Sequence, residues 1–566
     1  MTYSFEGSGE SGQKIQRVTD KGSLVSRDGE ADQLPFAAES VTPEQPISTG
    51  STEATSATLR TEVRGAISKV STSGRDVTLD LTRFVDSIQR ILVKSTARRY
   101  WPLIFFIALY VGWNLHLIWN QWNGYGYPPF DLAIFDQGLW LLTHFHAPFV
   151  TIMGRDLFGD HTSFILLLVA PFYRLFPEPM GILVMQTFAI AGASIPIFLI
   201  AQKLIKNTTI ATLLVAAYLL NPALQQGTLE QFHPEGFQVL IISLAIYAAI
   251  ESRAVLLGVM VALALLVKED AAVLIAPLGV WVMFRRNRLW GLRIIVAAVT
   301  WGLIANLAII PSLLGTNSFY ATRIPFGGLS GFLGTVFRRP GQLISYLRSD
   351  SRGFYVWQLG FSMGWVFLLA PELALLALLV IAENVLSSDP YMHQIIYHYT
   401  LAIIPILMIG TVYAVAKQKS ERRRYIATAI VVVTAAWSSI LWGLTPFADH
   451  STYALWAPGS PTVNAVNALE AKIPANAVVS AWYPLASHLH HRTQIYVWPT
   501  PFSASNWGLG TNTGARLPVS SQVQYLILPE PLDANDHNAT FTSLSTYFHL
   551  ISSASGIGLY QRDQTP

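Results

Sequence analysis

The chain has 566 residues, of which 52% are hydrophobic and 13% charged, and its mean hydropathy is +0.40. Soluble domains carry about 25% charged residues, so the composition indicates a multi-span membrane protein and not a large soluble enzyme. The net charge of +3 gives no support for a nucleic-acid partner. The absence of cysteine excludes disulfides, thiolate metal sites and cysteine nucleophiles.

The N-terminal segment is polar. Residues 1–75 are rich in Ser, Thr, Gly and Glu and lack the apolar core of a signal peptide, so we expect a disordered cytoplasmic tail. Residues 76–98 have apolar side chains at helical spacing. This pattern predicts an amphipathic juxtamembrane helix on the membrane surface; a short helical linker is the alternative.

Eleven apolar runs follow between residues 99 and 445. They predict an all-α polytopic fold with about eleven transmembrane helices, although several runs are shorter than the roughly 20 residues that cross a bilayer. The runs are 101–119, 180–202, 209–226, 237–250, 255–268, 271–284, 291–311, 354–369, 371–387, 400–416 and 425–444. A shorter apolar segment, 164–176, is expected to dip into the outer leaflet without crossing.

Basic residues set the expected orientation. Arginine and lysine clusters near residues 98, 203, 253, 285 and 422 all fall in the cytoplasm if the N-terminus is cytoplasmic. The loop 120–179 and the C-terminal residues 458–566 are then extracytoplasmic, at the plasma (cytoplasmic) membrane. Residues 458–566 read as a small α/β domain, with a helix at 461–473 and strands at 477–480, 492–498 and 524–528.

Unusual polar residues collect at the ends of the apolar runs, on the predicted outer face. Asp131 and Asp136 lie in the aromatic, apolar stretch 127–140, where a carboxylate is costly unless it is bound or used. Asp131 is a candidate general base, and the alternative is a helix N-cap. The candidate substrate-binding residues are Asp160, His161, His233, Glu235, Lys268, Glu269, Asp270, Arg323, His398 and Tyr399.

Each of these groups has a structural alternative. The Asp160-His161 pair either binds a metal or, as we favour, belongs to a polar loop. No cofactor is indicated, and a divalent metal is left open. Lys268 either pairs with an acid or holds a phosphate as a point charge. His233 and Glu235 could anchor a loop, and Tyr399 could belong to an interfacial aromatic belt. Nucleotide-binding and common hydrolase motifs are absent from the sequence.

Taken together, the motifs resemble a known family. Asp131-x4-Asp136-Gln137, Gly159-Asp160-His161, Phe232-His233-Pro234, Lys268-Glu269-Asp270 and His398-Tyr399 occur in an order similar to the multi-pass membrane family named domain of unknown function 2079 (DUF2079). The resemblance covers residues 100–530 and includes Ile473-Pro474, His488-Leu489, Arg492 and Tyr496 near the C-terminus.

More distantly, the layout resembles the GT-C superfamily of membrane glycosyltransferases. That resemblance implies an acidic base in the first outer loop, a polyprenyl-phosphate-linked sugar donor and an outward-facing site. By position Asp131 matches the base best and Asp136 second. The GT-C motif usually pairs two adjacent acids, whereas Leu132 follows Asp131 here.

The leading hypothesis is therefore an integral membrane glycosyltransferase that moves a sugar to an envelope acceptor. Lys268 and Arg323 would hold the leaving phosphate. The alternatives are a transporter or flippase of a lipid-linked or small polar substrate, and an outer binding or assembly protein that works through residues 458–566. The oligomeric state is left open.

Overall fold

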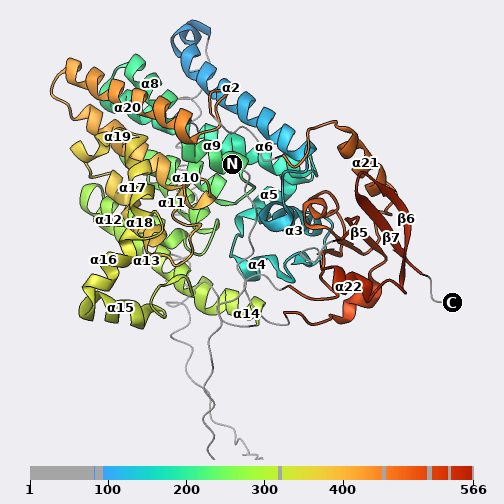
Figure 1. The fold of residues 1–566 in the computed structure, drawn as a ribbon. Coiled ribbons are helices and arrows are strands. Elements are labelled where there is room, and N and C mark those ends of the chain that lie inside the picture. Colours follow the sequence, from blue (N-terminus) through green and yellow to red (C-terminus); the bar gives the residue numbers. More distant parts are fainter. Residues whose placement is uncertain are drawn as a thin grey trace, which may run out of the picture. The chain divides into compact units, whose positions relative to one another are not determined.

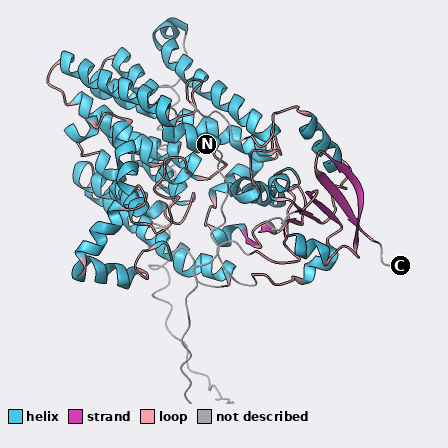
Figure 2. Cartoon of the chain, in the orientation of Figure 1, coloured by secondary structure: helices cyan, strands magenta, loops and turns pink. Residues whose placement is uncertain are grey.

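The computed structural model describes Thr82 and residues 94–315, 322–448, 454–505, 513–532 and 537–563. The predicted tail 1–75, and the predicted surface helix 76–98 except Thr82 and its last five residues, lie outside the described residues. The described part is mostly helical, with most of the strands in the C-terminal part (Figures 1 and 2). The predicted helical membrane fold is confirmed at this level.

Five described helical segments are long and apolar enough to cross a membrane, or six if a bent pair counts as one span. They are Tyr100–Asn123, Pro179–Ile205, Arg288–Leu314, His398–Ala416 and Glu421–Trp442, with the pair Thr208–Leu219 and Pro222–Leu229 bent by 47°. Four shorter apolar helical segments follow other predicted runs: Glu235–Ile250, Ala254–Leu265, Ala271–Arg285 and Ala374–Leu386.

The helices before residue 315 and the connections between them include the first long helix and most of the residues of the candidate site. Their bounds are α2 Lys94–Asn123, α3 Ile134–Thr143, α4 Leu157–Asp160, α5 Ile165–Tyr173, α6 Pro179–Gly192, α7 Ser194–Ile205, α8 Thr208–Leu219, α9 Pro222–Leu229, α10 Glu235–Ile250, α11 Ala254–Leu265, α12 Ala271–Arg285, α13 Arg288–Ile304 and α14 Ile310–Leu314.

The later helices are shorter on average and are interrupted by 3₁₀ turns. Their bounds are α15 Leu329–Arg338, α16 Pro340–Arg348, α17 Arg352–Phe361, α18 Leu378–Leu386, α19 Ile403–Ala416, α20 Glu421–Trp442, α21 Pro461–Glu470 and α22 Asn538–Thr542.

Helix α13 shows how composition and packing agree. Leu289, Leu292, Val296, Val299 and Leu303 recur every three or four residues, and each is about half exposed. In water such a stripe would be unfavourable, but hydrocarbon accepts it. The opposite face packs closely on α12, because a Cβ at Gly291 would overlap the backbone of Met283. The hairpin α12–α13 therefore pairs a helix–helix face with a lipid-facing one.

The bend between α8 and α9 has a local cause. Asn221 adopts an extended conformation and its side chain accepts a hydrogen bond from the backbone of Ala223 at 3.0 Å, while Pro222 begins the new helix. An Asn cap followed by Pro is a strong helix start. The apolar run 209–226 is thus two helices that meet at an angle.

The strands form two sheets. In the predicted outer loop, β1 (Phe149–Val150) and β2 (Arg155–Asp156) pair antiparallel. The C-terminal sheet has the order β4-β3-β5-β7-β6. Strand β3 runs parallel to both β4 and β5. Strand β7 runs antiparallel to both β5 and β6. Its strands are β3 Val479–Ala481, β4 Ile495–Val497, β5 Tyr525–Pro529, β6 Phe548–Ala554 and β7 Ile557–Arg562.

We call the described residues from 454 onward the C-terminal α/β region. The first three strands of its sheet and α21 fall where the sequence predicts them, whereas the hairpin β6–β7 was not predicted. In Figure 1 the labelled β5, β6 and β7 group with α21 and α22, beside the outer-loop helices α3 and α4.

Candidate functional site

Asp131 lies in a distorted turn directly before α3. Its backbone has φ 72° and ψ −76°, a region that non-glycine residues rarely adopt. Helix α3 is capped by Ala133 and no side chain bonds its first turn, so Asp131 is not the N-cap that we considered. Its carboxylate is 25% exposed and lies 3.3 Å from Nε2 of His233. Asp131 is therefore held facing an imidazole and remains partly open to solvent.

Nine of the twelve predicted site residues line one cavity of about 120 Å³ together with Arg155. The nine are Asp131, Asp160, His161, His233, Glu235, Lys268, Arg323, His398 and Tyr399. They come from the segment 120–179, the α9–α10 and α11–α12 connections, the first residue of α10, the segment before α15 and the start of the His398–Ala416 segment. The fold thus brings together residues separated by more than 250 positions.

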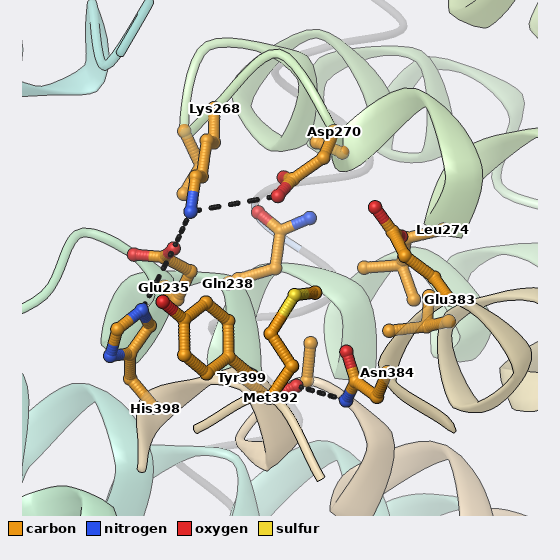
Figure 3. A pocket seen from close by; sticks show the side chains of 14 residues that line it. Glu235, Gln238, Lys268, Asp270, Leu274, Glu383, Asn384, Met392, His398 and Tyr399 are labelled. Atoms are coloured by element: carbon orange, nitrogen blue, oxygen red, sulfur yellow. Dashed lines mark hydrogen bonds and ion pairs between the residues drawn. The ribbon is translucent and has the colours of Figure 1, made fainter. Parts of the chain in front are cut away.

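Lys268 is enclosed by carboxylates. Its Nζ lies 2.8 Å from Glu235 Oε1 and 3.6 Å from Asp270 Oδ2, and its side chain is only 4% exposed. Figure 3 shows Lys268 between these two acids, with His398 on the other side of Glu235 at 3.8 Å. A second, smaller cavity of about 50 Å³ begins here and shares Glu235, Lys268, His398 and Tyr399 with the first. These four residues form a polar wall between the two cavities.

Glu269 joins the cluster from behind the cavity. One carboxylate oxygen lies 2.7 Å from His161 Nδ1, and the other accepts the backbone N–H of Thr162 at 3.1 Å. Asp160 pairs with Arg155 at 2.7 Å. Asp160 and His161 thus pair with Arg155 and Glu269, and both also line the cavity.

Arg323 lies beside Tyr399 in the lining of the larger cavity. The guanidinium of Arg323 lies 3.3 Å from the Tyr399 hydroxyl and 3.4 Å from Asp389, and it stacks over the Tyr399 ring at 5.5 Å. Its side chain is 26% exposed. Arg323 is consequently the most solvent-accessible of the three cations in the cavity.

His233 and His398 stack with their ring centroids 3.5 Å apart. Burial disfavours a charged His233, but Asp131 and Glu230 outweigh it and raise the pKa of His233 to about 9. Burial also raises the pKa of the Glu230 carboxyl to about 7, although His233 opposes that shift. Glu230, His233 and His398 offer three donor atoms within 4.8 Å of one another. These side chains could hold a divalent metal or a proton.

One glutamine, Gln186, positions both the loop that carries Asp131 and the loop that carries His233. Gln186 in α6 accepts the backbone N–H of His233 at 2.8 Å and donates to the carbonyl of Gln231 at 2.9 Å. The Gln231 side chain in turn accepts the backbone N–H of Leu132 at 2.9 Å. Gly236 leaves space for Gln186, since a Cβ there would lie 2.5 Å from its Cγ. The two loops that carry Asp131 and His233 are thus tied to α6.

Asp136, the second candidate base, lies outside this cavity. It is fully buried, and its Oδ2 contacts Nε2 of His490 and, at 2.7 Å, Nε2 of His491. Burial alone would raise the pKa of Asp136, but the two histidines lower it below its usual range. The neighbouring Gln137 donates to Thr151 Oγ1 at 3.0 Å and to the carbonyl of Arg492 at 3.1 Å. This segment connects α3 to the C-terminal α/β region.

Several residues of these clusters were not among the predicted site residues. They are Arg155, Glu230, Glu383, Asp389, His490 and His491. Glu230 stands three residues before His233, and a polar pair at that spacing at the end of an apolar run was a usable signal. The His490-His491 pair stands out as a dipeptide, but nothing in the local sequence links it to Asp136.

The arrangement combines a partly exposed carboxylate beside an imidazole with three cations in one enclosed space. Such a set can move a proton and bind an anion, the two requirements of many group-transfer reactions. The basic side chains Arg155, Lys268 and Arg323 each have acidic partners, so the cavity is close to neutral and an anionic ligand would compete with those carboxylates.

Comparison with curated proteins found no match for this chain. Among solved structures, the chain is similar to ArnT from Cupriavidus metallidurans bound to undecaprenyl phosphate, with 11% identity and a TM-score of 0.46, covering 81% of this chain and 97% of that one. The apo state of the same protein gives 13% identity and a TM-score of 0.43, covering 76% of this chain and 93% of that one. Residues 127–551 match the family described as "Predicted membrane protein (DUF2079)". The chain therefore belongs to the DUF2079 family of membrane proteins.

Proposed function

We propose that this protein is an integral membrane glycosyltransferase that takes a sugar from a polyprenyl-phosphate donor. The observation that carries the proposal is the meeting, in one cavity, of the partly exposed Asp131 carboxylate with Arg323 and Lys268. The distant resemblance of the layout to GT-C enzymes adds the expectation of a base in the first outer loop. No nucleotide-binding motif competes with a lipid-linked donor.

Asp131 is the base in this proposal. It accepts the proton of an acceptor hydroxyl, whose oxygen forms a bond to the anomeric carbon of the sugar while the bond from that carbon to the phosphate oxygen breaks. The products are the glycosylated acceptor and the polyprenyl phosphate. The His233 imidazole, 3.3 Å from Asp131, orients the carboxylate towards the cavity in this proposal. Asp136 is less suited because it is fully buried and already bound to two histidines.

The leaving phosphate is held by Arg323, with Lys268 contributing charge from the wall of the cavity. Arg323 is the better candidate for direct contact, because Lys268 is 4% exposed and lies between two carboxylates. A planar guanidinium can also bind two phosphate oxygens at once. Asp160, His161, Glu235, Glu269, Asp270, His398 and Tyr399 complete the proposed substrate-binding set.

The finer topology is part of the same proposal. We assign about eleven spans between residues 99 and 445, a cytoplasmic N-terminus and an extracytoplasmic domain at 458–566, in the plasma membrane. The assignment is supported by the basic clusters at one set of helix ends. The cavity then opens on the outer side, where an envelope acceptor is available.

Asp131→Asn tests the proposal. The substitution keeps the side-chain volume and shape at this backbone conformation, because Asn and Asp differ only in the terminal group. If Asp131 is the base, purified enzyme given radiolabelled polyprenyl-phosphate sugars should lose about 10²- to 10⁴-fold in transfer rate. Asp156→Asn is the matched control, since Asp156 caps α4 by accepting the N–H of Phe158 at 2.8 Å and Asn caps equally well.

Full activity of a stable Asp131→Asn enzyme, with an inactive Asp136→Asn, would transfer the role to Asp136. If the purified protein moved a lipid-linked sugar across the membrane of a vesicle without transferring the sugar, the flippase hypothesis would replace the transferase hypothesis.

A further inference from the structure

Asp136, His490 and His491 form a second compact group, outside the proposed catalytic cavity. Asp136 belongs to α3, and the two histidines lie in the loop before β4, more than 350 positions along the chain. Their donor atoms all lie within 4.8 Å of one another. Asp136 and His490 are buried, and the His491 side chain is 30% exposed. The group therefore bridges the outer loop and the C-terminal α/β region.

The hydrogen bonding of His490 fixes which nitrogen carries its proton. Nδ1 contacts the backbone carbonyl of Ser487, which can only accept, so Nδ1 must donate. In a neutral imidazole Nε2 then carries a lone pair, and this lone pair faces the carboxylate Oδ2 of Asp136. Two acceptors cannot share a contact without a positive charge between them. Either a proton between His490 Nε2 and Asp136 Oδ2 or a metal cation must therefore lie at this contact.

Two further features favour a cation. A second imidazole, His491, directs its Nε2 at the same oxygen of Asp136 at 2.7 Å. The other oxygen, Oδ1, is buried and has no hydrogen-bond partner among the described residues. A neutral His491 can donate its own Nε2–H to Oδ2, but a proton on either ring leaves Oδ1 without a partner, whereas a metal ion can take donors from all three side chains.

We propose that Asp136, His490 and His491 bind a divalent transition metal ion of the zinc type, which joins α3 to the C-terminal α/β region. Two imidazole nitrogens and one carboxylate are a common ligand set for zinc. The bond from His490 Nδ1 to a backbone carbonyl is the outer contact that usually orients a metal-bound histidine. The site is separate from the proposed transferase chemistry and does not depend on it.

The surroundings leave a fourth position and a route of entry. The Tyr173 hydroxyl lies 3.0 Å from His491 Nε2, where it could hydrogen-bond a metal-bound water or approach the ion. The exposed side of His491 gives the ion access from solvent. Ligands about 2.0–2.1 Å from an ion at tetrahedral angles stand about 3.3 Å apart, so binding requires only a small separation of Oδ2 from the two nitrogens.

The experiment measures zinc content in the full chain. Detergent-purified protein is stripped with a chelator, dialysed against Zn²⁺ alone and analysed for metal per polypeptide. Asp136→Asn and His491→Gln should each hold about one equivalent less than the wild type. His549→Gln is the matched control, because His549 pairs only with the exposed Asp563 and should bind as the wild type does. Any zinc at Glu230, His233 and His398 is common to all four proteins.

A second measurement tests the proposal even if the Asp136→Asn variant does not fold. His491 is partly exposed, so His491→Gln should keep the fold, and Zn²⁺ should raise the thermal midpoint of the wild type more than that of this variant. Equal zinc content and equal Zn²⁺ stabilisation in the wild type and His491→Gln would overturn the proposal. The bridge would then be a protonated His490 paired with Asp136.

Discussion

Glu470 is a half-buried residue at the contact between the end of the first long helix and α21. The Tyr125 hydroxyl donates to Glu470 Oε2 at 2.9 Å, while Oε1 is buried without a hydrogen-bond partner among the described residues. Burial raises the pKa of Glu470 from 4.5 to about 8, against the smaller effects of Tyr125 and Arg492. Glu470→Gln keeps the acceptor and removes the ionisation.

The sign of the pH effect follows from that raised pKa. The folded protein holds the Glu470 proton more tightly than the unfolded chain, so the group stabilises the fold fully below pH 4.5. This contribution is lost as the pH rises towards 8. At 1.36 kcal/mol per pH unit, the interval from 4.5 to about 8 corresponds to at most about 5 kcal/mol. Water that reaches the half-buried residue reduces this upper limit.

The assay is thermal unfolding in detergent, followed by tryptophan fluorescence from pH 5 to pH 8. The wild type should lose stability relative to Glu470→Gln as the pH rises, and the gap should be largest at pH 8. Glu421→Gln, at an exposed position, should follow the wild type. Parallel pH profiles for the wild type and Glu470→Gln would refute the argument that burial dominates at this residue.

Three other perturbations test separate parts of the structure. Thr151→Val removes a hydroxyl that accepts the N–H of Ile495 at 3.0 Å and donates to its carbonyl at 2.7 Å, so denaturation should show a loss of about 1–3 kcal/mol that Thr151→Ser restores. Arg352→Lys retains the charge but loses the planar donors that bind two backbone carbonyls. It should lower the free energy of unfolding by a similar amount. Single cysteines at Ser4 and Ser505 test topology: an impermeant thiol reagent should label position 505 and not position 4 in intact cells, and the reverse pattern would invert the proposed orientation.

Hydropathy predicts regular helices well and broken ones poorly. The run 271–284 became α12, Ala271–Arg285, almost to the residue. The runs 354–369 and 371–387 became two α-helices separated by 3₁₀ turns, because Gly364 adopts φ 59° and Pro371 follows. An apolar composition does not record such breaks, since the same residues suit either conformation.

The sequence predicted which residues meet at the cavity but not how they are arranged in space. Charges within apolar runs identified the residues that meet at the cavity, because burying such groups requires partners. Asp131 and Asp136 are five residues apart, yet one faces His233 and the other His490. That division depends on the distorted turn at Asp131 and on contacts across more than 350 residues. The β6–β7 hairpin was missed because His549, Leu550 and Ile551 are exposed, so β6 lacks a buried run.

The side chain of Gln186 sets the position of two loops relative to each other. Because it holds the backbone of His233 directly and that of Leu132 through Gln231, a shift of α6 carries both loops in the same direction. The spacing between the Asp131 carboxylate and the His233 imidazole is therefore insulated from local loop motion. A tilt of α6 that followed a change in bilayer thickness would therefore move the acid and the imidazole together and leave their spacing unchanged.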